Sequence, residues 1–172
     1  AEWQPVQQAL WFERKPRLPS EPALRMAHFL ADSDAQVLSV RVLADRQRWL
    51  GRNRDASQPR AAFDPWPAAG VAPQKDTVAL DTGLDPVCVL AVRLIVPPGS
   101  QARLTFATAA CDDGATLRAV IDKYRQSSQV QRASLMSATL AGIRLRTLRM
   151  VSDDLAAIQT LTTAMLLGLT RV

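Results

Sequence analysis

The sequence of 172 residues contains one histidine, one tyrosine and two cysteines, so it is poor in the side chains that carry most nucleophilic, acid–base and metal chemistry. Cys88 and Cys111 are too few for a disulfide framework and lack a metal-ligand spacing. His28 has no serine, cysteine or aspartate motif near it, and the chain contains neither a glycine-rich phosphate loop nor a nucleophile elbow. We therefore expect no metal site, no cofactor and no catalytic residue in this stretch.

Long hydrophobic runs are also absent. No basic region followed by an apolar core indicates a signal peptide. The most apolar stretch, residues 155–169, is interrupted by Gln159 and by threonines, and it is shorter than the roughly 20 residues of a membrane span. It is predicted to be a buried helix in a soluble segment that makes no membrane contact.

The formal charge is +5, and nearly all of the basic residues are arginines. Nucleic-acid binding requires a clustered basic face, whereas these arginines are spread along the chain among apolar residues. A solvated surface is the favoured interpretation, and we expect no nucleic-acid partner. Because the planar guanidinium donates several hydrogen bonds, arginine also suits sugar hydroxyls and phosphate.

The first two thirds of the chain have the alternation and the breakers of β-structure. Prolines at positions 16, 19 and 22 separate the first two runs, and Asp32-Ser33-Asp34 is typical of a turn. Strands are predicted over residues 8–13, 24–30, 37–43, 87–96 and 102–110. Residues 51–83 are different, because they are rich in proline and have no sustained period, which favours a functional loop or one packed over a neighbour.

The last two predicted strands flank Pro97-Pro98-Gly99-Ser100, which fits a type II turn. They are therefore predicted to form a hairpin. That hairpin places Cys88 opposite Ala109 and on the same face as Cys111. A disulfide between them is geometrically open, but buried free thiols are the favoured interpretation.

From Asp113 onward the period changes to that of helices. A first helix follows Asp112-Asp113, with Leu117, Val120, Ile121 and Tyr124 on its inner face. A second spans residues 129–148, with Leu135, Met136, Leu140 and Ile143 inward, and a third spans about 154–167. The acidic pairs 112–113 and 153–154 stand at helix starts, where they cap the helix rather than act as a glycosidase pair across a sugar.

Strands followed by helices indicate an α+β fold, or the seam between two domains. The last helix is apolar almost all round, which is typical of an element covered by something further.

An ordered series of short motifs resembles a known family. The motifs are Trp49-Leu50-Gly51-Arg52-Asn53-Arg54, Leu84-Asp85-Pro86-Val87, Pro97-Pro98-Gly99, Ala102-Arg103-Leu104-Thr105-Phe106 and Asp122-Lys123-Tyr124. They look like their counterparts in the carboxy-terminal module of cyclic β-1,2-glucan synthases, which is similar to the phosphorylases of glycoside hydrolase family 94. The likeness extends from about residue 10 to residue 168.

The resemblance implies an architecture and a parent enzyme. Residues 1–111 would be the later part of an antiparallel β-sandwich resembling galactose mutarotase, residues 112–150 a helical linker, and residues 151–172 the first helix of a truncated (α/α)6 barrel. The general acid and phosphate-binding residues of the family would lie in the barrel beyond residue 172. The parent would be a bacterial inner-membrane glycosyltransferase or phosphorylase with this module in the cytoplasm, and its partners would be β-glucan or oligosaccharide, with inorganic phosphate.

Four residues are candidate substrate contacts. Arg52 and Arg54 suit a glucan or phosphate, or they hold their loop through carboxylates such as Asp55 or Asp64. Trp49 and Trp66 suit stacking on a sugar, although core or interface packing is commoner for tryptophan.

Two functions compete at this point. The first is a non-catalytic portion of a glucan-synthesising or glucan-phosphorolysing enzyme. The alternative is a free-standing β-rich domain that binds carbohydrate or protein. Exposed strand edges and the last helix also offer routes to a homo-oligomer.

Overall fold

The computed structural model describes residues 1–52, 57–65 and 77–169, and the predicted residues Arg54 and Trp66 lie outside these ranges. The chain divides into two compact units, Ala1–Val130 and Gln131–Val172. The first unit contains the β-strands and the second is helical, so the α+β class predicted from the sequence is confirmed.

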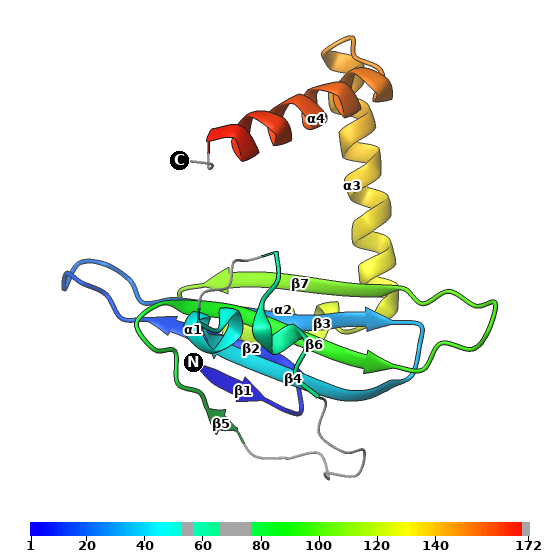
Figure 1. Cartoon of the computed structure of the whole chain (residues 1–172). Coiled ribbons are helices and arrows are strands. Elements are labelled where there is room, and N and C mark those ends of the chain that lie inside the picture. The colour runs from blue at the N-terminus through cyan, green and yellow to red at the C-terminus, as the bar shows by residue number, and fades with distance from the viewer. Residues whose placement is uncertain (53–56, 66–76, 170–172) are drawn as a thin grey trace. The chain divides into compact units, whose positions relative to one another are not determined.

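The first unit contains two antiparallel sheets (Figure 1). Its strands in the described residues are β1 (Glu2–Gln4), β2 (Ala9–Arg14), β3 (Leu24–Ser33), β4 (Val37–Asp45), β5 (Val78–Ala79), β6 (Pro86–Leu94) and β7 (Leu104–Cys111). One sheet has five strands in the order β5-β1-β2-β3-β7, and the other pairs β4 with β6. All five predicted strands are present. β1 and β5 were not predicted, because two or three residues carry no readable period.

The hairpin predicted for β6 and β7 is wrong. β6 pairs with β4, and β7 pairs with β3 in the other sheet, as Figure 1 shows. The turn itself is present, since Ser100 N donates to Pro97 O at 3.1 Å and Gly99 has φ +73°. It lies in a connection between sheets rather than between paired strands. Cys88 therefore does not oppose Ala109, which pairs with Ala27.

The chain passes between the two sheets in two connections, from β3 to β4 and from β6 to β7, and these connections lie side by side. The segment after β3 and the segment before β7 are tied by two bonds, Asp34 N to Arg103 O at 3.2 Å and Arg103 N to Asp34 Oδ1 at 2.6 Å. Beyond them, Ile95 N donates to Gln36 O at 3.3 Å. Because these two connections lie together, β7 is placed beside β3 in one sheet and β6 beside β4 in the other.

The core lies between the five-stranded sheet and helix α2 (Gly114–Tyr124). Leu117 and Ile121 of α2 are both 0% exposed, as the sequence pattern predicted. The sheet face that they meet is built mainly from small residues, which let a helix approach closely. Its buried or partly buried members are Ala9, Trp11, Ala27, Phe29, Ala31, Ala107, Ala109 and Cys111. α2 starts where predicted, because the Asp113 side chain accepts a bond from Thr116 N at 2.7 Å.

The other long helices are α3 (Ser127–Thr147) and α4 (Ser152–Leu169). Val130, in the first turn of α3, packs against the core of the first unit. The prediction that Leu135, Met136, Leu140 and Ile143 point inward is wrong, because they are 53–71% exposed. The helical unit has no fully buried residue among those whose burial is described, since α3 and α4 do not enclose an apolar layer. None of the helices in the described ranges combines the length and hydropathy of a membrane span.

Cys88 and Cys111 are both free and both half-buried, so the prediction of free thiols is confirmed. Cys88 lies within β6 and Cys111 ends β7, in different sheets. Burial raises the pKa of the Cys88 thiol to about 11. At neutral pH this thiol is therefore almost entirely protonated and a poor nucleophile.

We expect Leu117→Ala to lower the free energy of unfolding of the first unit by about 2–4 kcal/mol, because it leaves a cavity under α2. Leu135→Ala is the matched control, since Leu135 is 71% exposed. The control should change stability by less than about 0.5 kcal/mol. Urea unfolding followed by tryptophan fluorescence measures both, and equal effects would contradict the assigned core.

We also expect Cys88 to be the slower of the two thiols toward a disulfide reagent at pH 8. With a pKa of about 11, about one Cys88 thiol in a thousand is ionised at that pH. Cys88→Ser should remove the slow phase, and Cys111→Ser should leave it. Loss of the fast phase in Cys88→Ser would show that this thiol is not protected by burial.

Candidate functional site

A short helix, α1 (Arg46–Leu50), follows β4 and carries one side of the candidate site. Asp45 begins it, because its Oδ1 accepts from Gln47 N at 2.8 Å. Gly51 ends it, with φ +73° and its N–H donating to Gln47 O at 2.8 Å. This left-handed conformation favours glycine. The chain therefore turns sharply on both sides of one helical turn.

Asp45 is the one charged residue among those described that is classed as buried, and its surroundings explain how it is accommodated. Besides capping α1, its Oδ2 lies 3.6 Å from Arg48 Nε. Gly83 approaches so closely that a Cβ there would lie 3.0 Å from the Asp45 carboxylate, and it also has a positive φ of 56°. Gly83 is held by Asp81, whose Oδ1 accepts from Gly83 N at 2.9 Å. The buried carboxylate thus joins α1 to the chain entering β6.

A surface depression of about 610 Å³ lies beside α1. Its lining combines two guanidinium groups, one amide, one carboxylate and one apolar side chain. The lining residues are Arg46, Gln47, Leu50, Gly51, Arg52 and Asp85. Hydrogen-bond donors therefore predominate on its walls.

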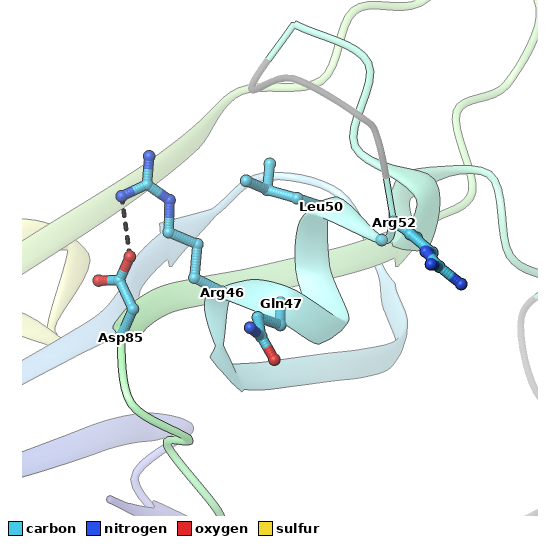
Figure 2. A pocket seen from close by; sticks show the side chains of 6 residues that line it. Arg46, Gln47, Leu50, Arg52 and Asp85 are labelled. Atoms are coloured by element: carbon cyan, nitrogen blue, oxygen red, sulfur yellow. Dashed lines mark hydrogen bonds and ion pairs between the residues drawn. The ribbon is translucent and has the colours of Figure 1, made fainter.

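The two arginines of the depression differ in their partners. Arg46 is joined to Asp85, with NH1 at 3.1 Å from Oδ2, and Arg46 N also donates to Asp85 O at 3.0 Å. Arg52 makes no hydrogen bond or ion pair with any residue that the structure describes. Figure 2 shows the Arg46–Asp85 pair and Arg52 at opposite ends of α1, with Gln47 between them. Among the described residues, therefore, the exposed Arg52 guanidinium has no partner that would compete with a ligand.

The loop beyond α1 is held by an arginine of β4, Arg41. Its NH1 donates to Ala61 O at 2.9 Å, and its NH2 donates to Asp64 O at 3.1 Å and Pro65 O at 2.8 Å. The one-turn helix η1 (Arg60–Ala62) lies within this loop, and Gly51 packs against the Arg60 side chain, since a Cβ there would be 2.7 Å from Arg60 Cβ. The described part of the loop is therefore anchored by Arg41 through carbonyl groups. Arg52 does not anchor it through Asp64, which was one alternative from the sequence.

The predicted site residues are placed as follows. Arg52 lines the depression, and Trp49 lies in α1, half-buried, but is not one of the lining residues. Arg54 and Trp66 fall outside the described residues. Sequence reasoning missed Arg46, Gln47, Leu50 and Asp85, although an aspartate before a run of helix formers is an N-cap signal that could have revealed α1.

The chain's one histidine lies away from this depression. His28 is on β3, where its Nδ1 lies 2.8 Å from Thr108 Oγ1 and its ring stacks on Phe106 with centroids 5.8 Å apart. Burial lowers the pKa of His28. Among the described residues no group of three or more histidine, cysteine or acidic side chains is arranged to hold a metal ion.

The arrangement around α1 can bind, but it offers little for bond cleavage. Hydrolysis or phosphorolysis of a glycoside needs a carboxyl group positioned at the scissile bond. The lining carboxylate, that of Asp85, is paired with Arg46 and more than half exposed. The guanidinium and amide groups suit hydroxyl or phosphate oxygens.

The β-sandwich and the motif series agree with a match to a protein family. The family model described as glycosyl hydrolase 94, supersandwich domain, matches residues 1–127. The chain therefore belongs to this family of carbohydrate-active enzymes, and the match includes every strand described above and the residues of the α1 depression.

One relative is a cyclic beta-(1,2)-glucan synthase, NdvB, of Rhizobium meliloti (strain 1021). It is 27% identical over 154 residues, which is 88% of this chain and 5% of that protein. The chain thus spans a small part of the length of the relative. The resemblance to the glucan synthase module, inferred from the motifs, is confirmed at the level of the family.

We expect Gly51→Ala and Gly142→Ala to change stability in opposite directions. At Gly51 an alanine adopts an unfavourable positive φ and meets Arg60, so the first unit should lose about 1–3 kcal/mol. At Gly142, within α3, a Cβ meets nothing within 4 Å, and alanine should add up to about 1 kcal/mol of helix stability. Thermal unfolding followed by circular dichroism measures both, and a Gly51→Ala protein as stable as the parent would contradict the α1 geometry.

Proposed function

We propose that this chain is a non-catalytic portion of a glucan-synthesising or glucan-phosphorolysing enzyme of the cyclic β-1,2-glucan synthase type. Its role would be to contact the carbohydrate and to shape the approach to a catalytic domain. The parent would transfer glycosyl groups or phosphorolyse β-glucan, with inorganic phosphate as a co-substrate.

The observation that carries the proposal is the α1 depression with Arg52 on its wall. An exposed guanidinium that has no partner among the described residues, beside an amide and a paired Arg–Asp couple, offers several donors to vicinal hydroxyl groups or phosphate oxygens. The rigid support of this helix fits such a role, because the Asp45 cap and the Gly51 and Gly83 turns keep the lining groups in fixed positions.

We also propose a domain assignment for the chain. Residues 1–111 would belong to the later part of the sandwich, residues 112–150 to a helical linker, and residues 151–172 to the first helix of an (α/α)6 barrel. The exposed apolar side chains of α3 and α4 support this assignment, because such faces are normally covered in a complete enzyme. The parent would be a bacterial inner-membrane protein with this module on the cytoplasmic side.

A second candidate is a free-standing β-rich domain that binds carbohydrate or another protein. The compact core of the first unit favours it, since Leu117 and Ile121 close that core within residues 1–130. The exposed apolar residues of the helical unit argue against it.

Isothermal titration of the chain with linear β-1,2-gluco-oligosaccharides, with cellobiose as the control sugar, tests the proposal. We expect weak binding to the β-1,2-glucan and no phosphorolysis of it. Arg52→Ala should weaken binding about three- to tenfold, because a hydrogen bond from a charged, exposed donor is lost.

Arg93→Ala is the matched control, because Arg93 is an exposed arginine on β6 that does not line the depression. The Arg93→Ala variant should bind the β-1,2-gluco-oligosaccharides with the affinity of the unchanged chain. Equal losses in both variants would indicate a general effect of charge, and absence of binding would leave only a scaffolding role. Turnover of the glucan would place catalytic residues within this chain and overturn the proposal.

A further inference from the structure

Arg60, in the one-turn helix η1, brings a second exposed arginine to the α1 depression. Its side chain lies across the backbone of Gly51, since a Cβ at Gly51 would be 2.7 Å from Arg60 Cβ and 3.0 Å from Arg60 Cδ. Arg52, which lines the depression, is the next residue after Gly51. Because Gly51 has no side chain, the aliphatic part of Arg60 can lie directly beside the residue that precedes Arg52.

The charges of these two arginines are not neutralised within the part of the chain that the structure describes. Arg52 and Arg60 are both exposed, and their side chains form no ion pair or hydrogen bond with a described residue. Asp64, in the same loop as Arg60, pairs with neither of them. Like charges so placed repel each other, and an anion bound to both would remove that repulsion.

The carboxylates around α1 are engaged with other arginines. Asp85 pairs with Arg46 at 3.1 Å. Asp45 Oδ2 lies 3.6 Å from Arg48 Nε, and Asp81 Oδ2 lies 3.7 Å from NH2 of the same arginine. Among the described residues, positive charge is therefore in excess at the end of α1 where Gly51 follows it.

The two ends of the depression consequently differ in chemistry, and Figure 2 shows the Arg46–Asp85 pair and Arg52 at opposite ends of α1. The Arg46–Asp85 pair places a donor beside an acceptor, which suits a hydroxyl group because a hydroxyl both donates and accepts. Arg52 and Arg60 offer only charged donors. Such donors suit an oxyanion, which accepts charge-assisted hydrogen bonds from guanidinium groups.

We propose that Arg52 and Arg60 form an oxyanion subsite, and that the α1 depression takes an anionic saccharide. The phosphate or carboxylate group of that saccharide binds at the subsite, and its hydroxyl groups face the Arg46–Asp85 pair. The proposal rests on the proposed function in using the same depression as the ligand site. It adds the charged group by which the site distinguishes one saccharide from another.

The test is isothermal titration of the full chain at low ionic strength in a buffer without phosphate. The ligands are glucose 6-phosphate, glucuronate, glucose and inorganic phosphate. We expect glucose 6-phosphate to bind at least about tenfold more tightly than glucose, because it adds charge-assisted hydrogen bonds. Glucuronate, with a single charge, should lie between them. Added salt should weaken binding of the two anionic sugars and leave that of glucose unchanged.

Substitutions at Arg60 separate its charge from its packing on Gly51. Arg60→Met keeps an aliphatic side chain against Gly51 and removes the charge, so it should weaken glucose 6-phosphate binding about three- to tenfold. It should change the affinity for glucose by less than about twofold, because Arg60 does not line the depression. Arg60→Lys keeps the charge and should retain most of the affinity. Arg93→Met, at an exposed arginine of β6, is the matched control and should bind like the unchanged chain.

Three results would overturn the inference. Equal affinities for glucose and glucose 6-phosphate would show that the depression does not select a charge. Equal losses in Arg60→Met and Arg93→Met would assign the effect to net charge rather than to a subsite. Inorganic phosphate binding as tightly as glucose 6-phosphate would show that the sugar makes no contact.

The same titrations separate this inference from the proposed function. A chain that binds the β-1,2-gluco-oligosaccharides and shows no preference for anionic sugars keeps the proposed function and contradicts the inference. A chain that binds glucose 6-phosphate through Arg60 and does not bind the neutral glucan supports the inference and contradicts the glucan contact.

Discussion

The packing of α2 on the five-stranded sheet is the contact on which the first unit depends. Leu117 and Ile121 are completely buried, and they meet a face in which alanines dominate on β2, β3 and β7. Small side chains let the helix backbone approach the sheet, and Leu117, Ile121, Phe29 and Trp11 are the large buried side chains between them. Since interiors are close-packed, the same alanines leave little space for larger residues. This contact also links residues near both ends of the unit, because β2 lies near its start and α2 near its end.

The position of the second sheet depends on two adjacent connections, one from β3 to β4 and the other from β6 back to β7. Asp34 joins the two connections, because its backbone N–H donates to Arg103 O and its carboxylate accepts from Arg103 N. The chain then continues as β4 on one side and returns as β6 on the other, and the two strands pair. At the far end of this pair, Asp45 lies opposite Pro86 and begins α1. The candidate site therefore lies at the end of the smaller sheet, where the chain leaves β4 and enters β6.

The site combines a rigid frame with a guanidinium, that of Arg52, which has no partner among the described residues. Buried Asp45, the two positive-φ glycines and the anchor formed by Arg41 restrict the backbone around α1. The frame uses its charges internally, as in the Arg46–Asp85 and Arg48–Asp45 pairs. Arg52 takes part in neither of these pairs, and within the described part of the chain its guanidinium faces no competing partner. The helical unit is different, because its apolar side chains are largely exposed and its described residues form none of the ion pairs seen in the first unit.

Sequence periodicity and turn chemistry determined the elements with the most regular patterns. They gave the positions of β2, β3, β4, β6 and β7 and the capped start of α2 with its buried face. The resemblance of short motifs indicated the family and named Arg52, which lines the depression, as a candidate contact. These features follow from local preferences, from alternation of side chains and from short motifs. Only the tertiary structure decided which strands are neighbours. A short turn at Pro97–Ser100 suggested a hairpin, yet β6 and β7 belong to different sheets, because pairing depends on contacts between residues far apart in the chain. The same reason explains why the depression beside α1 was not predicted. Asp85 lies next to Arg46 only because β4 and β6 pair, and no local sequence pattern predicts that contact.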